Sequence, residues 1–409
     1  MALHDPRKII DTLRNHLTHP DTNVAFLFGA GTSTAVRVPF LNDASEPCER
    51  ALIPTVAELT ATCALEIDKL DPQGEAPVFG LALAAITAEV KPAHREANIE
   101  DILSGVQRKI EAIGQNDLLC GLDRQKFALL SETIRRTIAA QVNPDPTDFP
   151  KRLPHADFVR WASHMSRPQA VELFTTNYDI LFETALEAER ALSFDGFVGC
   201  NTPFFCHETL TRPEAAPGSN WIRLWKVHGS INWQLVTVDG RKRVVRTTPQ
   251  AEGEMIMPSH HKYDESRKQP YTALLDRLRK VMERDDTILF VCGYSFSDDH
   301  INAILFDALE ARQRPHIIAL QYGDPEDGSV LCERAKRLRN LIVLGPTEAI
   351  IRGEKAQWSA PDDGQLALIG NAFERLENGA VEADWRGRLQ LGDFAKFARF
   401  AASLVGQVS

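Results

Sequence analysis

Six short apolar runs place the strongest constraint on how this chain of 409 residues can fold. They are rich in Val, Ile, Leu and Phe without polar alternation, a pattern typical of strands that are covered on both faces. The runs occupy residues 24–28, 171–175, 222–227, 287–292, 316–320 and 340–344. Helical patterns separate several of them, notably at 271–284 and 300–313. This alternation predicts an α/β fold with a doubly wound, mostly parallel, Rossmann-like sheet.

The spacing of the first two runs indicates an insertion. A crossover between parallel strands needs only a dozen or more residues, yet residues 34–170 separate these two. Helical periodicity extends through most of 56–142. We therefore predict a helical module at 55–155, inserted into a sheet domain made of 1–35 and 165–345. Such a module can form one wall of a ligand cleft.

The pattern changes after residue 345. Residues 346–362 are rich in Pro, Gly and charge, and helices are predicted near 363–377 and 391–406. We therefore describe 346–409 as a C-terminal helical segment. Its last helix has apolar residues at helical spacing, namely Phe394, Phe397, Ala401 and Leu404. That face suits packing on the body of the protein, and the alternative is docking of a partner.

A hairpin is predicted from strands at 233–238 and 241–247, which flank the pair Asp239-Gly240. Asp-Gly is typical of a type I′ turn. The second strand makes this the most basic element of the chain, with Arg241, Lys242, Arg243 and Arg246. A solvated hairpin and contact with nucleic acid or an acidic partner are both compatible with this charge.

Composition limits the class of protein. A formal net charge of -10 disfavours a protein whose main task is to grip a phosphate backbone. The first 17 residues predict a charged amphipathic helix instead of a signal peptide, and no apolar run is long enough to span a bilayer. Seven cysteines without a CxxC pair argue against a disulfide frame or a zinc ribbon. We expect a cytoplasmic protein with no membrane contact and no metal.

Four of the predicted strands end in islands of glycine and polar residues. The islands are GAGTS at 29–33, TTNYD at 175–179, KVHGS at 226–230 and GYSFSDDH at 293–300. Each island alone is also compatible with a simple turn. Because ligands bind at the carboxyl edge of open parallel sheets, their joint occurrence favours one ligand cleft.

The islands contain residue types suited to a nucleotide and to proton transfer. Asn177 has an acceptor and two donors for a ribose hydroxyl or a water, and Asp179 can accept from a nicotinamide carboxamide. His228 is the candidate general base, since its ordinary pKa is near neutral. Asp298 can cap the helix that begins near His300 or bind a hydroxyl. The predicted nucleotide-binding residues are Gly29, Ala30, Gly31, Thr32, Ser33, Asp179, Gly293, Ser295 and Asp298.

Taken together, these islands resemble the sirtuin-like NAD-binding domain, specifically its bacterial branch found in anti-phage defence. IPTVAELT at 53–60 and NIEDILS at 98–104 are also similar to that branch, and the likeness covers about residues 20–345. The resemblance implies that Asn177 and His228 are required for cleaving NAD, and that Asp179 recognises the nicotinamide amide. It also implies that the glycine turn and the Gly-Tyr-Ser segment hold the pyrophosphate and ribose.

Two departures separate this chain from classical sirtuin deacylases. Their four-cysteine zinc module has no equivalent here, which makes lysine deacylation a poor expectation. Their Gly-Ile-Pro-Asp-Phe-Arg loop is replaced by Val36-Arg37-Val38-Pro39-Phe40, and Ile53-Pro54-Thr55 follows an insertion. The sequence therefore does not determine which residues line the nicotinamide pocket.

The resemblance implies a hydrolase that converts NAD to nicotinamide and ADP-ribose and acts as an abortive-infection effector. It also implies a homo-oligomer that assembles with a HerA-type hexameric ATPase, with nucleic acid bound only through that complex. An alternative is an NAD- or ADP-ribose-sensing regulatory subunit of such a complex. A protein deacylase is the third possibility.

Overall fold

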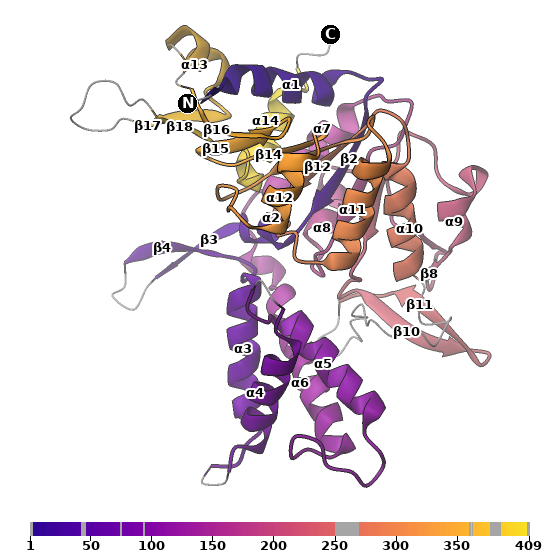
Figure 1. Ribbon diagram of the computed structural model, residues 1–409. Coiled ribbons are helices and arrows are strands. Elements are labelled where there is room, and N and C mark those ends of the chain that lie inside the picture. The colour runs from indigo at the N-terminus through magenta and orange to yellow at the C-terminus, as the bar shows by residue number, and fades with distance from the viewer. Residues whose placement is uncertain are drawn as a thin grey trace.

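A ten-stranded sheet forms the centre of the computed structural model, which describes residues 3–41, 46–73, 76–92, 95–249, 270–359, 361, 363–376 and 386–406 (Figure 1). In sheet order the strands are β1 (Leu3–His4), β16 (Glu354–Trp358), β15 (Glu348–Ile351), β14 (Leu341–Leu344), β13 (His316–Leu320), β12 (Thr287–Cys292), β2 (Asn23–Phe28), β5 (Glu172–Thr175), β9 (Ile222–Lys226) and β6 (Ser193–Phe194). Only β15 runs antiparallel to its neighbours.

All six predicted strands are present, and they are neighbours in the order β14-β13-β12-β2-β5-β9. Strand β2 shows why its sequence does not alternate. Phe26 and Phe28 are buried in the core on one face of the sheet, and Ala25 and Leu27 are buried in the core on the other. The predicted α/β fold with a mostly parallel, Rossmann-like sheet is confirmed.

Helices cover both faces of the sheet. One core contains side chains from α1 (Pro6–Thr18), α7 (Pro154–His164), α8 (Leu181–Ala188) and α14 (Phe394–Ser403). The opposite core contains side chains from α10 (Tyr271–Met282), α11 (Asp299–Ala311) and α12 (Val330–Arg337). The helices predicted at 271–284 and 300–313 are thus confirmed as α10 and α11. Short connecting helices are η1 (Pro146–Asp148), α9 (Glu208–Thr211) and η2 (Pro213–Ala215).

The helical module consists of α3 (Val56–Asp68), α4 (Val78–Val90), α5 (Ile99–Ala112) and α6 (Arg124–Val142), seen as a bundle below the sheet in Figure 1. Capping boxes start two of these helices, Thr55 with Glu58 at α3 and Asn98 with Asp101 at α5. The module has its own hydrophobic core, which Tyr178 and other residues of the sheet domain join. The hairpin of β3 (Arg37–Leu41) and β4 (Pro47–Ala51) precedes it and was not predicted. The domain boundaries stay a prediction.

The C-terminal segment contains strands as well as helices. The helix predicted at 363–377 is wrong beyond α13 (Asp363–Ile369), because Gly370-Asn371 ends it and β17 (Phe373–Leu376) follows; residue 377 lies outside the described residues. Strand β17 pairs with β18 (Arg386–Leu389), while β15 and β16 extend the main sheet. The apolar face predicted for the last helix packs on the body, with Phe394 and Phe397 at most 1% exposed.

The predicted basic hairpin is present as β10 (Trp233–Val238) and β11 (Arg241–Arg246), in a small sheet with β8 (Phe204–Phe205) and β7 (Phe197–Val198). Asp239 and Gly240 have φ values of 51° and 73°, as a type I′ turn requires. Arg246 pairs with Asp195 at 2.5 Å, whereas the residues at 241–243 are exposed.

One buried histidine makes the stability of the fold depend on pH. His155 at the start of α7 is fully buried against the rings of Phe182 and Phe394, and neither ring nitrogen has a partner among the described residues. Burial lowers the pKa of His155 to about 3. Between that value and its ordinary pKa, the unfolded chain therefore binds a proton that the folded protein does not.

Lowering the pH from about 6 to 4 is expected to reduce the free energy of unfolding by about 1.4 kcal/mol per pH unit through this residue. In His155→Leu this slope should disappear, which urea unfolding across the pH range measures. The control is His164→Leu at the exposed end of the same helix, which should keep the wild-type slope. An unchanged slope in His155→Leu would contradict the prediction.

Candidate active site

The four predicted islands meet at the carboxyl edge of the adjacent strands β9, β5, β2 and β12, and two of them touch backbone to backbone. The Gly31 N–H donates to the Gly293 carbonyl at 2.9 Å. A Cβ atom on Gly29 would lie 2.5 Å from the Gly293 oxygen, and one on Gly31 would lie 2.6 Å from Gly293 Cα. These glycines therefore allow two loops of the chain to approach each other closely. This approach places the short helix α2 (Ala30–Thr34) directly beside the Gly-Tyr-Ser loop.

Asn177 is held against the glycine turn. Its amide nitrogen donates to the Gly29 carbonyl at 3.1 Å, to Thr32 Oγ1 at 3.0 Å and to Ser33 Oγ at 2.7 Å. The side chain is 8% exposed. Because its two N–H groups already have these acceptors, Oδ1 is the atom of Asn177 that is left to accept from a ligand.

Ser33 joins Asn177 to Asp179. Its hydroxyl accepts from the Asn177 amide and donates to Asp179 Oδ2 at 2.6 Å. The other carboxylate oxygen, Oδ1, accepts from the Leu181 backbone N–H at 3.0 Å. Three predicted site residues thus form one buried chain, Asn177–Ser33–Asp179.

A cavity of about 140 Å³ lies beside Asp179. Its walls are mainly apolar, including Ile53, Val142, Phe149, Ile180 and Leu181. Complete ligand pockets measure roughly 300–1,000 Å³, so this one is sized for a single ring rather than a dinucleotide. Of the two segments left open by the sequence, Ile53 lines the cavity, whereas Pro39 and Phe40 belong to strand β3.

His228 is paired with Asp298. The ring Nε2 lies 2.9 Å from Asp298 Oδ2, while Asp298 Oδ1 accepts from the backbone N–H groups of His300 and Ile301. The predicted cap on α11 is therefore confirmed. The other ring nitrogen of His228, Nδ1, is buried and has no partner among the described residues. With Nε2–H donated to the carboxylate, Nδ1 is the basic atom.

The environment sets the charge of this pair. Burial alone would lower the pKa of His228, but the hydrogen bond to Asp298 and the negative charges of Glu100 and Asp298 together raise it above the ordinary value. Burial pushes the pKa of Asp298 up, but the hydrogen bond and charge of His228 and the capped backbone N–H groups bring it down to about 2. The carboxylate is therefore ionised at neutral pH and stabilises a proton on the imidazole.

Ser295 stands apart from this arrangement. Its hydroxyl is exposed and lies 2.8 Å from that of Ser297. Among the residues that the structure describes, no hydrogen bond joins it to Asn177 or His228. Its predicted role in binding a nucleotide stays a prediction.

Lys226 was quoted in the KVHGS island but given no role, and the structure shows what it does. The side chain is 2% exposed, and its ammonium group donates to the backbone carbonyls of Tyr178 and Asp179 and to Glu183 Oε1 at 2.9 Å. Burial raises the pKa of Glu183, although Lys226 opposes that shift. Lys226 thus fixes the Asn177–Asp179 loop through two of its backbone carbonyls. A single lysine after an apolar run gives no sequence signal for this role.

Replacing this ammonium group should be costly. Lys226→Met is expected to lower the free energy of unfolding by about 3 kcal/mol, because it leaves the half-buried Glu183 carboxylate without its partner. Chemical denaturation measures the loss, and the exposed Lys126→Met is the control. Adding Glu183→Gln to Lys226→Met should recover part of the stability. A double variant no more stable than the single one would show that the ion pair is not the cause.

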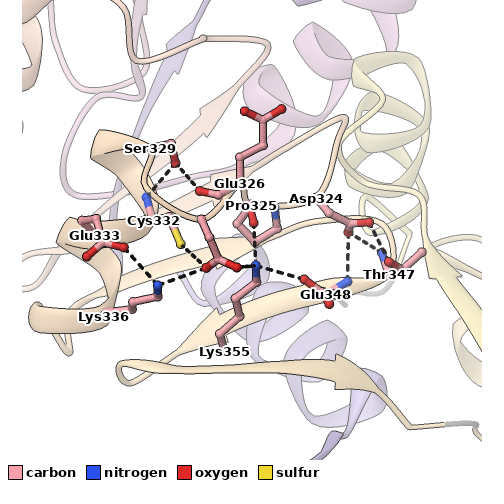
Figure 2. A network of polar contacts seen from close by, with 11 residues as sticks. Asp324, Pro325, Glu326, Ser329, Cys332, Glu333, Lys336, Thr347, Glu348 and Lys355 are labelled. Carbon is pink, nitrogen blue, oxygen red and sulfur yellow. Dashed lines mark hydrogen bonds and ion pairs between the residues drawn. The ribbon is translucent and has the colours of Figure 1, made fainter. Parts of the chain in front are cut away.

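An ion-pair network fixes the loop that follows β13 (Figure 2). Asp327 accepts from Lys336 at 3.0 Å and from Lys355 at 3.1 Å, and these hydrogen bonds lower the pKa of Asp327 to about 2. Asp324 accepts from the backbone N–H groups of Thr347 and Glu348. The network ties the loop to α12, β15 and β16. Since its charges are paired with one another, we assign it a structural role.

Comparison with protein families identifies part of the chain. Residues 171–341 match the SIR2-like domain, so this part of the chain is similar to sirtuin-like domains. Domains of this kind bind NAD and belong to NAD-utilising enzymes. The matched range includes Asn177, His228 and Asp298, while the structure adds the glycine turn as the neighbouring loop. Comparison with curated proteins finds no match.

Within the described parts of the chain, no three His, Cys, Asp or Glu side chains are grouped in a way that could hold a metal ion. In the same residues, no helix combines the length and the apolar character needed to cross a membrane.

Proposed function

We propose that this protein is an NAD glycohydrolase, which cleaves the nicotinamide–ribose bond to give nicotinamide and ADP-ribose. The observation that carries the proposal is the buried His228 ring, whose Nε2 is paired with Asp298 and whose Nδ1 is left without a partner in the described structure. A protein that only binds NAD has no need of an oriented base. The match of residues 171–341 to the SIR2-like domain supports NAD as the substrate.

The geometry suits the chemistry of this bond. Nicotinamide leaves as a neutral pyridine, so departure needs no acid, and the transition state has oxocarbenium character. In the proposed reaction Asn177 Oδ1 accepts from a ribose hydroxyl or the attacking water, and His228 Nδ1 takes the proton. The cavity beside Asp179 would receive the nicotinamide ring, with the carboxylate accepting from its amide.

We propose further that the enzyme is a cytoplasmic effector of anti-phage defence by abortive infection. An enzyme that destroys NAD must be held inactive until it is needed, so its control has to come from assembly or from a partner. On the resemblance noted above, we propose a homo-oligomer that assembles with a HerA-type hexameric ATPase. Nucleic acid would be bound only through that complex, with the exposed basic residues 241–243 as the local candidate.

Two other functions make different predictions. An NAD- or ADP-ribose-sensing subunit would bind the nucleotide without cleaving it, and it would leave the paired His228 unexplained. A deacylase would release nicotinamide only with an acyl-lysine peptide, and the chain lacks the zinc module of those enzymes.

The test is to incubate the purified protein with NAD and to measure nicotinamide and ADP-ribose by chromatography. Reactions with and without acyl-lysine peptide, and with and without the ATPase, separate the three functions. Release of both products without peptide supports the hydrolase. NAD binding without cleavage in every reaction would favour the sensor.

A further inference from the structure

Tyr178 links the candidate site to the helical module. It stands between Asn177 and Asp179, but its ring belongs to the hydrophobic core of the module and is 7% exposed. Its hydroxyl donates to Glu100 Oε1 of α5 at 2.9 Å. The residue between the two predicted ligand contacts is therefore anchored in a different part of the molecule.

The backbone of Tyr178 is held as firmly as its side chain. Its carbonyl oxygen accepts from the Ile231 N–H at 3.0 Å, from the Ser230 hydroxyl at 3.3 Å and from the Lys226 ammonium at 3.3 Å. With the backbone held by the KVHGS island and the ring held by the module, a displacement of the module has to move the Asn177–Asp179 loop or break these contacts.

Glu100 also acts on His228. The rings of Tyr178 and His228 have centroids 6.4 Å apart, and the Glu100 carboxylate that binds the Tyr178 hydroxyl exerts its negative charge on the imidazole. The ionisable groups that act on the imidazole are Asp298 at the start of α11 and Glu100 of α5. Glu100 is thus the residue of the helical module whose charge acts on His228.

The start of α5 holds Glu100 in place. Asn98 caps the helix by accepting from the backbone N–H groups of Glu100 and Asp101. Asp101 in turn forms a two-point ion pair with Arg95, at 2.5 and 3.0 Å. The carboxylate is therefore presented from a fixed helix terminus and not from a loose loop.

We infer that Glu100 is a positioning residue. Through Glu100, the position of the helical module affects both the Asn177–Asp179 loop and His228. The inference rests on the proposed hydrolase. When the module is seated, Glu100 orients Tyr178 and places a negative charge beside the imidazole. When the module moves away, both effects are lost together. A partner that shifts the module would thereby regulate NAD cleavage without touching the reacting atoms.

Two substitutions separate the hydrogen bond from the charge. Glu100→Gln keeps an acceptor for Tyr178 but removes the charge, so the His228 pKa and the acid limb of the kcat/KM profile should both move to lower pH. Tyr178→Phe keeps the charge but removes the hydrogen bond. It should lower kcat/KM about tenfold, the usual effect of losing a hydrogen bond to a charged group, with the His228 pKa unchanged. Glu66→Gln on α3 is the control for loss of a carboxylate elsewhere in the module.

The His228 pKa is measured by NMR titration of protein labelled with ¹⁵N-histidine, with the resonance assigned from its absence in His228→Asn. This reading needs no catalytic activity. If the wild type fails to cleave NAD but Glu100→Gln lowers the titration point, the proposed function fails while the role of Glu100 at His228 stands. If Glu100→Gln titrates like the wild type and like Glu66→Gln, the inference is overturned.

Discussion

His228→Asn is expected to lower NAD cleavage by at least about a hundredfold, the usual contribution of a positioned general base. The variant removes Nδ1, the ring atom without a partner among the described residues, and an amide in its place cannot take up a proton. Asn177→Ala should have a comparable effect, because it removes the free Oδ1 and three contacts to the glycine turn. Nicotinamide release measures both losses.

The matched control is His164→Asn, an exposed substitution on α7 that should keep wild-type activity. The pH profile supplies a second reading. Because the base must be unprotonated and its pKa is raised, kcat/KM should increase with pH through a midpoint above 6.5, the ordinary histidine value. Activity that survives in His228→Asn would mean that another group takes the proton.

Gly293→Ala is expected to lower the free energy of unfolding by several kcal/mol and to abolish NAD binding. The residue has φ +68°, a conformation that costs a non-glycine residue about 1–2 kcal/mol. A Cβ atom there would also lie 2.7 Å from the Thr32 backbone nitrogen and 2.9 Å from Gly31 Cα. Those neighbours are backbone atoms, so the two loops would have to separate, which adds about 1–3 kcal/mol of overpacking.

Gly240→Ala separates these two effects. Gly240 has a similar φ of +73°, but a Cβ atom there would meet nothing within 4 Å. It should therefore show only the conformational cost and should leave NAD binding intact. Thermal unfolding and calorimetric titration with NAD measure the two properties. Equal destabilisation in both variants would show that contact between the loops adds nothing.

Local sequence patterns predicted the sheet because its strands are buried on both faces, which suppresses alternation over stretches such as 24–28 and 287–292. The carboxyl ends of such strands necessarily share an edge, so Asn177, His228 and Asp298 could be placed in one cleft. The Asp298 cap was predictable because an aspartate directly before a helix has a local role.

What could not be predicted depends on contacts between distant segments. The burial of Lys226 beneath the Asn177–Asp179 loop, and the hydrogen bond from Tyr178 to Glu100, join residues with no periodic relation. Strands β15 and β16 were missed because they lie in the stretch 346–362, which is rich in Pro, Gly and charge, and β3 and β4 because they lie between residues 35 and 55, where no element was predicted. Gly29 and Gly31 were predicted to approach a ligand, whereas their neighbour in the structure is Gly293.

For the proposed hydrolase, the contact between Gly31 and Gly293 also bears on when NAD cleavage becomes possible during protein synthesis. Gly31 and Gly293 are far apart in the sequence, although their loops touch. Asp298, the partner of His228, belongs to the same late loop as Gly293. A ribosome that has synthesised residues 1–230 has made Asn177 and His228 but neither Gly293 nor Asp298. Because protein synthesis proceeds from the N-terminus, abandoned or prematurely released chains of that length would lack an assembled site. The order of the loops along the gene would thus confine NAD cleavage to chains that have been translated past β12.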